Sequence, residues 1–514
     1  MHPDSDLLTP LKHFWGYEGF RPLQQRIVHS LLDGHDIAVI MPTGGGKSLC
    51  YQLPAVILGR TAIVISPLIA LMQDQAAQLA RMGIPAAVLN SAMASAEQSE
   101  VIRRALDGAY RLLYLSPERL ARQDTMAWLA RVPIAFFAID EAHCISEWGH
   151  EFRPEYRQLS SLREYFPDLP IAAFTASATR RVRHDILQQL RLRTPDKYIA
   201  SFHRPNLRYL VRECDADTQR GLLLAAMRAY AGSNVIIYAP TIARVEETVG
   251  FLAQRKIAAI PYHGKMETRD RHRNQERWMS DEVRVLVGTL AFGLGINKAA
   301  VRAVIHLALP KSIEQYYQEA GRAGRDGLAA DCALLWQKRD AGLLAYFIDQ
   351  LNDANEKERA WQHYHAIRRF TTARFCRHRQ ICTHFGETPK WETCGMCDVC
   401  AELPEWLRGS VKSTVKVRQK GRKRKAAGPD TESSGSPDRE LVEHMREWRR
   451  DASKRDGVPA YIILHDSSLE ELCRRRPANV HELLEVRGIG PRKAELYSRE
   501  ILTALKAYDR SPSE

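Results

Sequence analysis

Short apolar runs alternate with amphipathic segments along the first two thirds of the chain. From Asp36 onward, each run is followed by a stretch with helical spacing, such as LIALMQDQAAQLARMG. An uninterrupted apolar strand between helices is typical of a parallel sheet that is covered on both faces. The runs that predict the strands of a first sheet are DIAVIMP, TAIVISP, RLLYLSP, IAFFAID and IAAFTAS.

A second series of such runs begins after the segment SFHRPNLRY. It consists of NVIIYAP, VRVLVGT, AVIHLALP and CALLWQ. The pattern therefore predicts an α/β fold with two tandem, doubly wound parallel-sheet domains, and ligands of such domains bind above the carboxyl ends of the strands. The domains expected from the whole pattern are 1–203 and 204–340 (parallel-sheet domains), 341–402 (helical region), 403–436 (polar, basic, flexible linker) and 437–510 (small helical domain).

Composition agrees with a multidomain globular protein. The chain has 514 residues, of which 45% are hydrophobic and 26% charged. Its net charge of +13 suits a polyanionic partner, because a cationic protein releases counterions from a phosphate backbone when it binds. The first ten residues lack the basic and apolar regions of a signal peptide, and no apolar run approaches the length of a membrane span. We therefore expect a cytoplasmic protein with no membrane partner.

A glycine-rich segment, MPTGGGKS, follows the first predicted strand. Thr43, Gly44, Gly45 and Gly46 can turn backbone N–H groups toward phosphate oxygens, while Lys47 neutralises them and Ser48 can ligate Mg²⁺. The general pattern has glycine at the position of Met41, and a purely structural glycine turn is the alternative. The placement between a strand and a helix favours a phosphate-binding loop.

Two adjacent carboxylates end the apolar strand in FFAIDEAH. Asp140 is expected to hold Mg²⁺, and Glu141 to orient or deprotonate an attacking water. Acidic pairs after strands often cap helices instead. The presence of Lys47 upstream favours the catalytic interpretation.

The segment QYYQEAGRAGRDG contains two arginines, Arg322 and Arg325. Their spacing of three predicts that both lie on one helical face and point toward the γ-phosphate of a nucleotide held by the first domain. Hydrolysis would then depend on domain closure. The alternative is an arginine-rich helix exposed to solvent.

Three cysteines lie close together in CGMCDVC. Cys394, Cys397 and Cys400 have the spacing of thiolates that share one tetrahedral metal, and a closed structural zinc site needs a fourth ligand. Spacing alone does not choose among the upstream candidates, and a redox pair, which needs only two cysteines, is an alternative to zinc. The candidates for the fourth ligand are Cys376, Cys382, His378 and His384.

In this order along the chain, the motifs resemble those of the RecQ family of superfamily 2 DNA helicases. They are WGYEGFRPLQ, MPTGGGKS, SPLIALMQDQ, YLSPERL, DEAHCISEWGHEFRPEY, TASAT, VGTLAFGLGINK and QEAGRAGRDG. The resemblance implies RecA-like domains, the cofactors ATP, Mg²⁺ and Zn²⁺, and single-stranded or tailed and forked duplex DNA as partner. Single-strand-binding protein is a further candidate partner, and the expected location is the bacterial cytoplasm, at the nucleoid.

The resemblance also implies roles for single residues. Tyr17, Arg21 and Gln24 match the adenine-recognition motif, and His143 and Gln318 join Lys47, Asp140, Glu141, Arg322 and Arg325 in the catalytic set. Trp148, Phe152 and Arg153 match the aromatic-rich loop that engages single-stranded DNA, although the residues alone favour a core role for the two rings. Zinc is assigned by the resemblance to Cys376, Cys394, Cys397 and Cys400.

The C-terminal segment resembles the HRDC domain of RecQ proteins. Its GIGPRK turn, Gly488 to Lys493, is either a phosphate site or an ordinary interhelical turn. The RQKGRKRK stretch before it is either a solvated tether or a phosphate-binding arm. Typical bacterial members have a winged-helix domain between zinc region and HRDC domain, and the space after Cys400 is too short for one.

The resemblance implies an ATP-dependent 3′-to-5′ DNA helicase that acts in repair and recombination. The missing winged helix motivates an alternative, a DNA-stimulated ATPase that translocates or anneals strands with weak unwinding. A non-catalytic DNA-binding scaffold is a third hypothesis, and the complete set of Lys47, Asp140, Glu141 and Arg325 argues against it.

Overall fold

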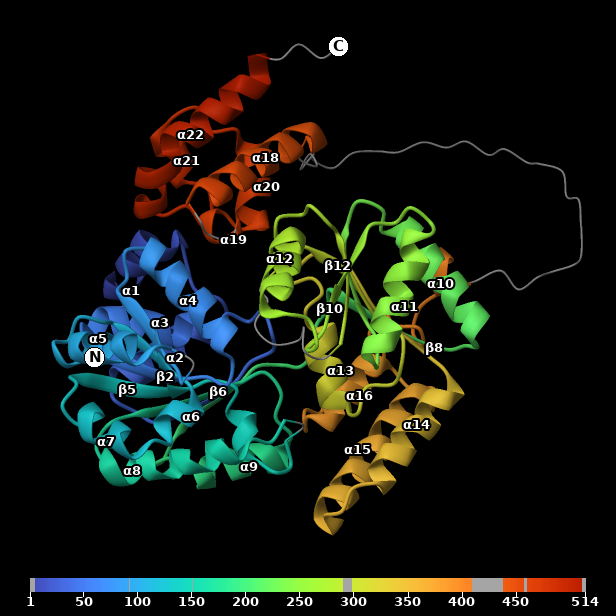
Figure 1. Ribbon diagram of the computed structural model, residues 1–514, viewed down its shortest axis with the longest axis horizontal. Helices are drawn as coiled ribbons and strands as arrows, with labels where there is room; N and C mark the ends of the chain where they lie inside the picture. The colour runs from blue at the N-terminus through green and yellow to red at the C-terminus, as the bar shows by residue number, and fades with distance from the viewer. Residues whose placement is uncertain are drawn as a thin grey trace, which may run out of the picture.

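The computed structural model describes residues 5–91, 93–149, 151–289, 298–408, 438–456 and 460–510. Most of the motif VGTLAFGLGINK and of the predicted linker 403–436 lies outside these residues. Two sheet-containing lobes lie side by side, a helical region extends from the second lobe, and a small helical domain lies over both lobes (Figure 1). No helix in this part of the chain is both long and apolar enough to cross a membrane.

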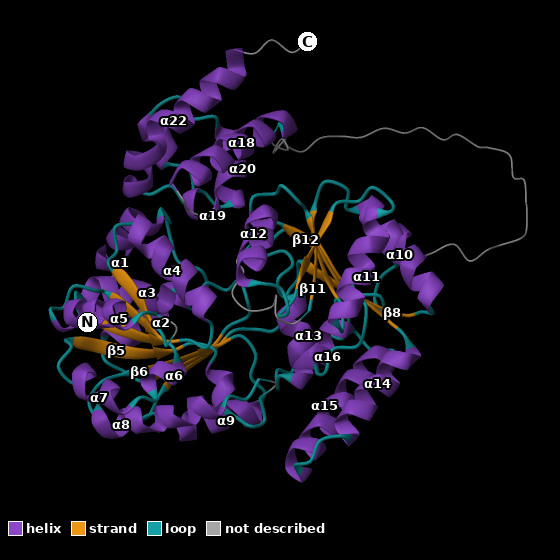
Figure 2. Cartoon of the chain, in the orientation of Figure 1, coloured by secondary structure: helices purple, strands orange, loops and turns teal. Residues whose placement is uncertain are grey.

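The first lobe is built on a parallel sheet of seven strands in the order β3-β4-β2-β5-β6-β1-β7. Helices lie on both sides of the sheet (Figure 2). The strands are β1 (Ile37–Ile40), β2 (Thr61–Ile65), β3 (Ala86–Leu89), β4 (Leu112–Leu115), β5 (Ile134–Ile139), β6 (Ile171–Thr175) and β7 (Asp196–Ile199). The helices are α1 (Ser5–Pro10), η1 (Leu11–Trp15), α2 (Gln24–Leu32), α3 (Leu49–Leu58), α4 (Ile69–Arg81), α5 (Ser95–Leu106), α6 (Pro117–Leu120), α7 (Gln123–Leu129), η2 (Ala142–Ile145), η3 (Pro154–Ser161), α8 (Leu162–Tyr165) and α9 (Arg180–Gln189).

The second lobe has a six-stranded parallel sheet in the order β10-β11-β9-β12-β13-β8. The two tandem parallel-sheet domains predicted from the apolar runs, which the resemblance identifies as RecA-like, are thereby confirmed. The strands are β8 (Leu207–Glu213), β9 (Asn234–Tyr238), β10 (Ala259–Tyr262), β11 (Val285–Gly288), β12 (Val301–His306) and β13 (Ala330–Trp336). The helices are α10 (Ala216–Ala229), α11 (Ile242–Ala253), α12 (Thr268–Met279) and α13 (Ile313–Ala320).

The sequence pattern found the central strands and missed the edges. The four strands that it did not predict, β3, β7, β8 and β10, are the outermost strands of the two sheets. Central strands such as β1, β2 and β5 are buried at every position, whereas β7 and β10 contain partly exposed residues. An edge strand has one side open to solvent, so its sequence need not be a continuous apolar run.

Helices complete the chain. In the zinc region these are α14 (Lys338–Asp349), α15 (Ala354–Thr372), α16 (Arg377–His384) and α17 (Glu405–Arg408). Helix α17 lies in the range predicted as linker, but Trp406 and Leu407 are buried in the hydrophobic core of the second lobe. The C-terminal domain has its own core and consists of α18 (Arg439–Asp456), α19 (Ala460–Ile463), α20 (Asp466–Arg475), α21 (Val480–Leu484) and α22 (Pro491–Arg510).

A buried carboxylate fixes the start of β1, the strand that leads to the glycine-rich loop. Asp36 Oδ1 accepts a hydrogen bond from the Ile171 backbone at 2.9 Å. Its Oδ2 accepts from Arg163 Nη2 at 2.5 Å and from the Arg193 backbone at 2.6 Å. Since β1 and β6 pair directly, this carboxylate sets the relative position of the two strands that lead into the site.

Asp36→Ala is expected to lower the apparent melting temperature by roughly 6 to 12 °C. The substitution leaves Arg163 Nη2 and two backbone N–H groups without their acceptor, which costs about 3 kcal/mol. Differential scanning fluorimetry measures the effect, with Asp33→Ala at an exposed position as the control. A variant that melts with the wild type would contradict the anchoring role.

Candidate nucleotide cleft and zinc centre

A cavity of about 520 Å³ lies where the two lobes and the C-terminal domain meet. The glycine-rich loop, the acidic pair and the arginines of the second lobe line it together. The residues of the two lobes that line it include Tyr17, Arg21, Gln24, Thr43, Gly44, Gly46, Lys47, Ser48, Asp140, Glu141, Gln318, Arg322 and Arg325. Most of the nucleotide-site residues predicted from sequence therefore surround one space.

The loop between β1 and α3 has the backbone of a phosphate-binding turn. Gly44 and Gly46 have φ angles of +84° and +82°, which lie in a region of positive φ that residues other than glycine rarely adopt. A Cβ at Gly46 would lie 2.4 Å from Gln24 Nε2. Met41, at the position where the general pattern has glycine, is buried in the core, and its carbonyl accepts a hydrogen bond from Lys47 Nζ at 3.2 Å.

The predicted adenine motif contacts this loop directly. Arg21 Nη1 donates to the Gly44 carbonyl, and Gln24 Nε2 donates to the Gly46 carbonyl at 3.1 Å. Gln24 Oε1 in turn accepts from the Arg21 backbone at 2.8 Å. A base bound at Tyr17, Arg21 and Gln24 would therefore affect the position of the phosphate loop.

The acidic pair lies at the end of β5, facing Lys47. Burial and the neighbouring Glu141 raise the pKa of Asp140 to about 7, although Lys47 opposes the shift. Burial also lowers the pKa of Lys47, against the attraction of the two carboxylates. Two adjacent carboxylates at the edge of a phosphate pocket form a donor set that suits Mg²⁺, since a hard cation would relieve their repulsion.

A chain of hydrogen bonds runs from His143, which lies beside the acidic pair, to the second lobe. His143 Nδ1 lies 3.3 Å from Glu141 Oε2 and 3.0 Å from Thr175 Oγ1. Thr175 Oγ1 accepts from the Ser177 backbone at 3.3 Å, and Ser177 Oγ accepts from Gln318 Nε2 at 2.8 Å. Burial alone would lower the pKa of His143, but Cys144 and Glu141 raise it well above its ordinary value.

The two arginines lie in turns, so the prediction of a shared helical face was wrong. Helix α13 ends at Ala320, and the glycines at 321 and 324 follow it. The turn packs across the lobe boundary, since a Cβ at Gly44 would lie 3.4 Å from Arg325 Cγ. Burial and the nearby Arg322 and Arg204 lower the pKa of Arg325 to about 9.

Sequence reasoning missed Arg204, which joins the glycine-rich loop to this turn. Its Nη1 donates to the Thr43 carbonyl at 2.9 Å, and its Nη2 donates to the Gly324 carbonyl at 3.2 Å. The residue lies in SFHRPNLRY, the segment that the sequence identified only as the junction of two domains. The sequence signal that could have identified Arg204 was its place in the junction between the two domains that carry the phosphate-site motifs.

The aromatic-rich loop lies beside the DEAH motif. Tyr156 Oη donates to the Asp140 carbonyl at 3.0 Å, and a Cβ at Gly149 would lie 2.6 Å from the His143 carbonyl oxygen. The guanidiniums of Arg181 and Arg359 lie 3.0 Å and 5.5 Å from the Trp148 ring centroid.

Phe152 is half-buried, with Arg157 5.3 Å from its ring centroid. Arg153 Nη1 donates to the Pro67 carbonyl at 3.4 Å. Trp148 packs partly buried against the core of the lobe. The loop is thus held close to the catalytic residues, with its rings only partly covered.

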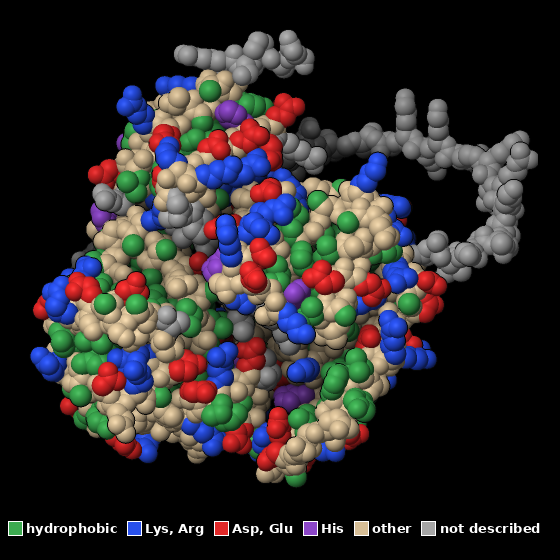
Figure 3. Space-filling model, viewed as in Figure 1, with side chains coloured by type: hydrophobic (Ala, Val, Ile, Leu, Met, Phe, Trp, Pro, Cys, Tyr) green, Lys and Arg blue, Asp and Glu red, His purple; other side chains and the backbone are tan. Residues whose placement is uncertain are grey.

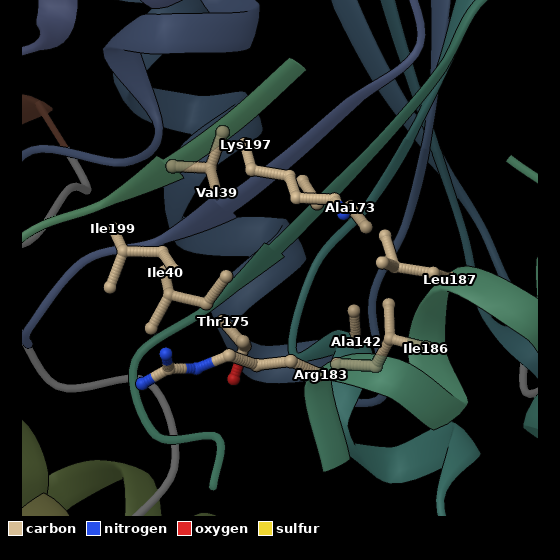
Figure 4. A pocket seen from close by; sticks show the side chains of 11 residues that line it. Val39, Ile40, Ala142, Ala173, Thr175, Arg183, Ile186, Leu187, Lys197 and Ile199 are labelled. Atoms are coloured by element: carbon tan, nitrogen blue, oxygen red, sulfur yellow. The ribbon is translucent and has the colours of Figure 1, made fainter. Parts of the chain in front are cut away.

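A second, smaller cavity of about 30 Å³ lies between β1, β6, β7 and α9. Figure 4 shows that its walls are mainly aliphatic side chains, with Thr175 and Arg183 at one edge. The Thr175 hydroxyl already takes part in the hydrogen-bond chain to Gln318. This space is a packing gap behind the chain of hydrogen bonds.

Four cysteines of the zinc region form a compact cluster. The sulfur atoms of Cys376, Cys394, Cys397 and Cys400 all lie within 4.8 Å of one another. Tetrahedral zinc with bonds of about 2.3 Å places its sulfur ligands roughly 3.8 Å apart, so the donor set fits. Backbone N–H groups of Arg377 and Cys397 point at Cys397 Sγ (3.4 Å) and Cys394 Sγ (3.3 Å), as expected for sulfurs that carry negative charge.

The other candidate ligands have different partners. His378 Nε2 lies 2.9 Å from the Leu207 carbonyl, and His384 Nε2 lies 2.7 Å from Glu314 Oε1. Cys382 is buried in the core that joins the lobes to the zinc region. None of these three belongs to the described cysteine cluster.

The zinc region binds to both lobes. The Asp398 backbone donates to the Tyr209 carbonyl in β8 at 3.1 Å. On the other side, Arg183 Nη2 in α9 donates to the Phe385 carbonyl at 2.6 Å. A metal in the cysteine cluster would stabilise a structural unit that spans the lobe boundary.

Comparison with known proteins identifies relatives of each part of the chain. Residues 21–186 match the DEAD/DEAH box helicase family, and residues 219–327 match the helicase conserved C-terminal domain. Residues 338–401 match the RecQ zinc-binding family, and residues 438–505 match the HRDC domain. These matches leave only residues 402–437 between the last two.

The relatives extend over nearly the whole chain. The ATP-dependent DNA helicase RecQ of Haemophilus influenzae is 32% identical over 595 aligned positions, covering 98% of this chain and 96% of the relative. The RecQ of Bacillus subtilis is also 32% identical, covering 97% and 98%. Since the alignment with the first exceeds the 514 residues of this chain, that relative has segments that this chain lacks.

Among solved structures, the DUF1998 helicase MrfA bound to DNA has a similar fold. The match has a TM-score of 0.55 at 18% identity and covers 65% of this chain and 51% of that one. It supports the arrangement of the two parallel-sheet lobes.

Arg325→Ala is expected to lower the rate of ATP hydrolysis roughly 10³-fold, because the charge that faces the γ-phosphate position is lost. Nucleotide binding should change much less, since the glycine-rich loop remains intact. Steady-state hydrolysis and equilibrium binding of a fluorescent ATP analogue measure the two effects, with Arg255→Ala on the exposed surface of the second lobe as the control. Near-normal turnover by Arg325→Ala would contradict the assignment.

Cys376→Ser is expected to abolish tight binding of zinc, whereas Cys382→Ser, at a buried cysteine outside the cluster, should keep one zinc ion per chain. A three-thiolate site loses the closed tetrahedral shell that makes a structural zinc stable. Metal content after dialysis against a chelator distinguishes the variants. Equal zinc content in both would exclude Cys376 as a ligand.

Proposed function

The chain belongs to the RecQ family of ATP-dependent DNA helicases, and we propose that it uses ATP hydrolysis between its lobes to move 3′ to 5′ along one DNA strand and separate duplexes during repair and recombination. Its matches to two helicase domain families, and a helicase relative that it matches over nearly the whole chain, show that it is an ATP-hydrolysing helicase. The observation that carries the proposal is the shared cavity, in which first-lobe Lys47, Asp140 and Glu141 face second-lobe Arg325.

The first step is to hold the nucleotide. Gly44 and Gly46 turn the loop backbone toward the phosphates, and Lys47 supplies a positive charge. Asp140, with Ser48, would hold Mg²⁺, which neutralises charge on the β and γ phosphates when bound. Tyr17, Arg21 and Gln24 would select adenine at the outer end of the cavity.

Hydrolysis follows from closure of the lobes. Glu141 lies beside Asp140 and would orient the attacking water, while Arg325 and Arg322 meet the γ-phosphate from the second lobe. Arg204, Arg322 and Arg325 form a cluster of positive charge in which Arg322 is buried and the other two are partly buried, and a triphosphate would compensate it. Loss of the γ-phosphate removes part of that compensation and so favours reopening.

The hydrogen-bond chain and the aromatic-rich loop would couple this cycle to DNA. His143 contacts Glu141 and Thr175, and Ser177 receives Gln318 from the second lobe. The aromatic-rich loop lies close to the His143 carbonyl at Gly149, where an added Cβ would be 2.6 Å from the carbonyl oxygen. A base stacked on Trp148 would therefore act on the residue that contacts the catalytic glutamate.

The alternative, a translocase or annealing factor with weak unwinding, is not favoured, because relatives that match nearly the entire chain are DNA helicases. We propose that the duplex is engaged by parts other than a winged helix. Residues 402–437, between the zinc-binding and HRDC matches, are too few for a domain of that size.

A strand-separation assay tests polarity and function together. We expect a duplex with a 3′ single-stranded tail to be unwound with ATP, and one with a 5′ tail to remain paired. Lys47→Ala should abolish both ATP turnover and unwinding, because the phosphates lose their main positive partner. Turnover on single-stranded DNA without separation of either substrate would support the translocase instead.

Trp148→Ala is expected to raise by roughly tenfold the concentration of single-stranded DNA needed for half-maximal ATPase stimulation, since one stacked base is lost. The matched control is Trp361→Ala, at a ring in α15 that stacks on His365 rather than in the loop. An unchanged DNA dependence in Trp148→Ala would contradict the role of the loop.

A further inference from the structure

The C-terminal helical domain lies across the opening between the two lobes. In Figure 1 its helices lie above α1 and α4 of the first lobe and beside α12 of the second. Figure 3 shows this domain in contact with both lobes, with basic and acidic side chains gathered where it approaches the second. Its placement over the nucleotide cleft follows from separate contacts with each lobe.

Contact with the first lobe is made by the turn before α22. The Gly488 N–H donates to the Gly16 carbonyl at 3.3 Å. A Cβ at Gly490 would lie 2.8 Å from the His13 carbonyl oxygen, so glycine permits the backbones to approach this closely. The GIGPRK turn, which the sequence left as either a phosphate site or an ordinary turn, here docks on η1.

Side chains next to the turn extend this contact to α4. Arg81 Nη1 donates to Tyr497 Oη at 2.6 Å, and Gln78 Nε2 lies 3.2 Å from His465 Nε2. Burial and the nearby Lys493 lower the pKa of His465 to about 4, so the neutral ring can accept from the Gln78 amide. Lys493 is itself only 6% exposed and does not face solvent as a phosphate-binding lysine would.

Contact with the second lobe is electrostatic. The side chain of Asp281, just after α12, is 2% exposed and pairs with Lys298 at 2.7 Å within its own lobe. Arg446 and Arg449 of α18 approach the same carboxylate at 3.4 Å and 3.7 Å. Burial alone would raise the pKa of Asp281, but these three cations hold it well below its ordinary value. A buried carboxylate shared by two domains favours one docked position, because undocking removes two of its partners.

The docked domain forms part of the nucleotide cavity. Residues of α20 and of the turn before α22 line the same 520 Å³ space as the glycine-rich loop and Arg325. The Arg487 guanidinium lies 5.7 Å from the ring centroid of Tyr17, in the predicted adenine motif. The contributing residues of the domain are His465, Ser467, Ser468, Glu470, Glu471, Arg474 and Arg487.

We infer that the C-terminal domain is a gate of the nucleotide site: docked on both lobes, it closes the adenine end of the cleft and sets the rate at which ADP leaves. Arg487 acts as a nucleotide-positioning residue beside Tyr17. This inference rests on the proposed binding of ATP in the cleft. It assigns to the domain a role in the nucleotide cycle that is separate from DNA binding.

Gly490→Ala and Gly490→Leu test the gate. The φ angle of Gly490 is not in the left-handed region, so a side chain there is compatible with the turn and clashes chiefly with the first lobe. We expect release of a fluorescent ADP analogue, measured by stopped flow without DNA, to become about fivefold faster with alanine and faster still with leucine. Gly221→Ala, at a glycine with no atom near the added Cβ, is the matched control.

Hydrogen exchange of the backbone amides of Leu11–Trp15 reports docking independently. Faster exchange with an unchanged release rate would overturn the gate, since the domain would have left without consequence. Unchanged exchange in both Gly490 variants would overturn it as well, because the docked contact would then not exist in solution.

Arg487→Ala separates positioning from docking. We expect it to weaken binding of the ADP analogue several-fold with normal exchange in Leu11–Trp15, and Arg487→Lys to restore part of the affinity. Unchanged affinity in Arg487→Ala would remove the positioning role. Lys47→Ala distinguishes failure of the underlying site: if the analogue binds that variant as it binds the wild type, the nucleotide is not held in this cleft and the proposed function fails first.

Discussion

Closely spaced positive charge at the boundary between the lobes, largely withdrawn from solvent, is the constraint on which the rest of this protein depends. Arg204 and Arg325 contact the glycine-rich loop with Arg322 nearby, and burial together with the charges of Arg322 and Arg204 lowers the pKa of Arg325. Like charges in a poorly solvated space repel, so the closed arrangement of the lobes gains stability from an anion that lies among them. In the proposed function, a triphosphate between Lys47 and Arg325 would be that anion, and its conversion to diphosphate would weaken the attraction. In that proposal, the binding energy of the nucleotide would change the distance between the two sheets.

The acidic pair is connected to the second lobe and to the aromatic-rich loop through the same residue. His143 contacts Glu141 and Thr175, and the chain continues through Ser177 to Gln318. Because each member has a defined partner, a movement of Gln318 with the second lobe would reach Glu141 through these contacts in the proposed function. The loop that carries Trp148 approaches the backbone carbonyl of His143 at Gly149, so in the proposed function DNA and nucleotide would both act through this residue.

Both C-terminal parts bind across the lobe boundary, but by different physical means. The zinc region is continuous with the hydrophobic core of the lobes, and its cysteine cluster replaces the core that so short a segment could not build. The C-terminal domain has a separate core and is held by a few hydrogen bonds and a shared buried carboxylate. The first arrangement suits a permanent brace, and the second suits a contact that forms and breaks within a cycle.

Sequence alone determined what depends on local pattern. Central strands are buried on both faces and therefore read as apolar runs, and the glycine-rich loop and the acidic pair follow such strands directly, so the fold class and these two motifs could be predicted. Edge strands such as β7 carry a mixed pattern because one side meets solvent, and they escaped prediction. Contacts between distant residues, such as Arg204 against Thr43 and Gly490 against His13, were decided only by packing. The structure also showed that Arg322 and Arg325 lie in a turn rather than in a helix. In each of these long-range contacts, neither residue affects the sequence pattern near the other. Only the folded chain brings the two residues within a few ångströms of each other.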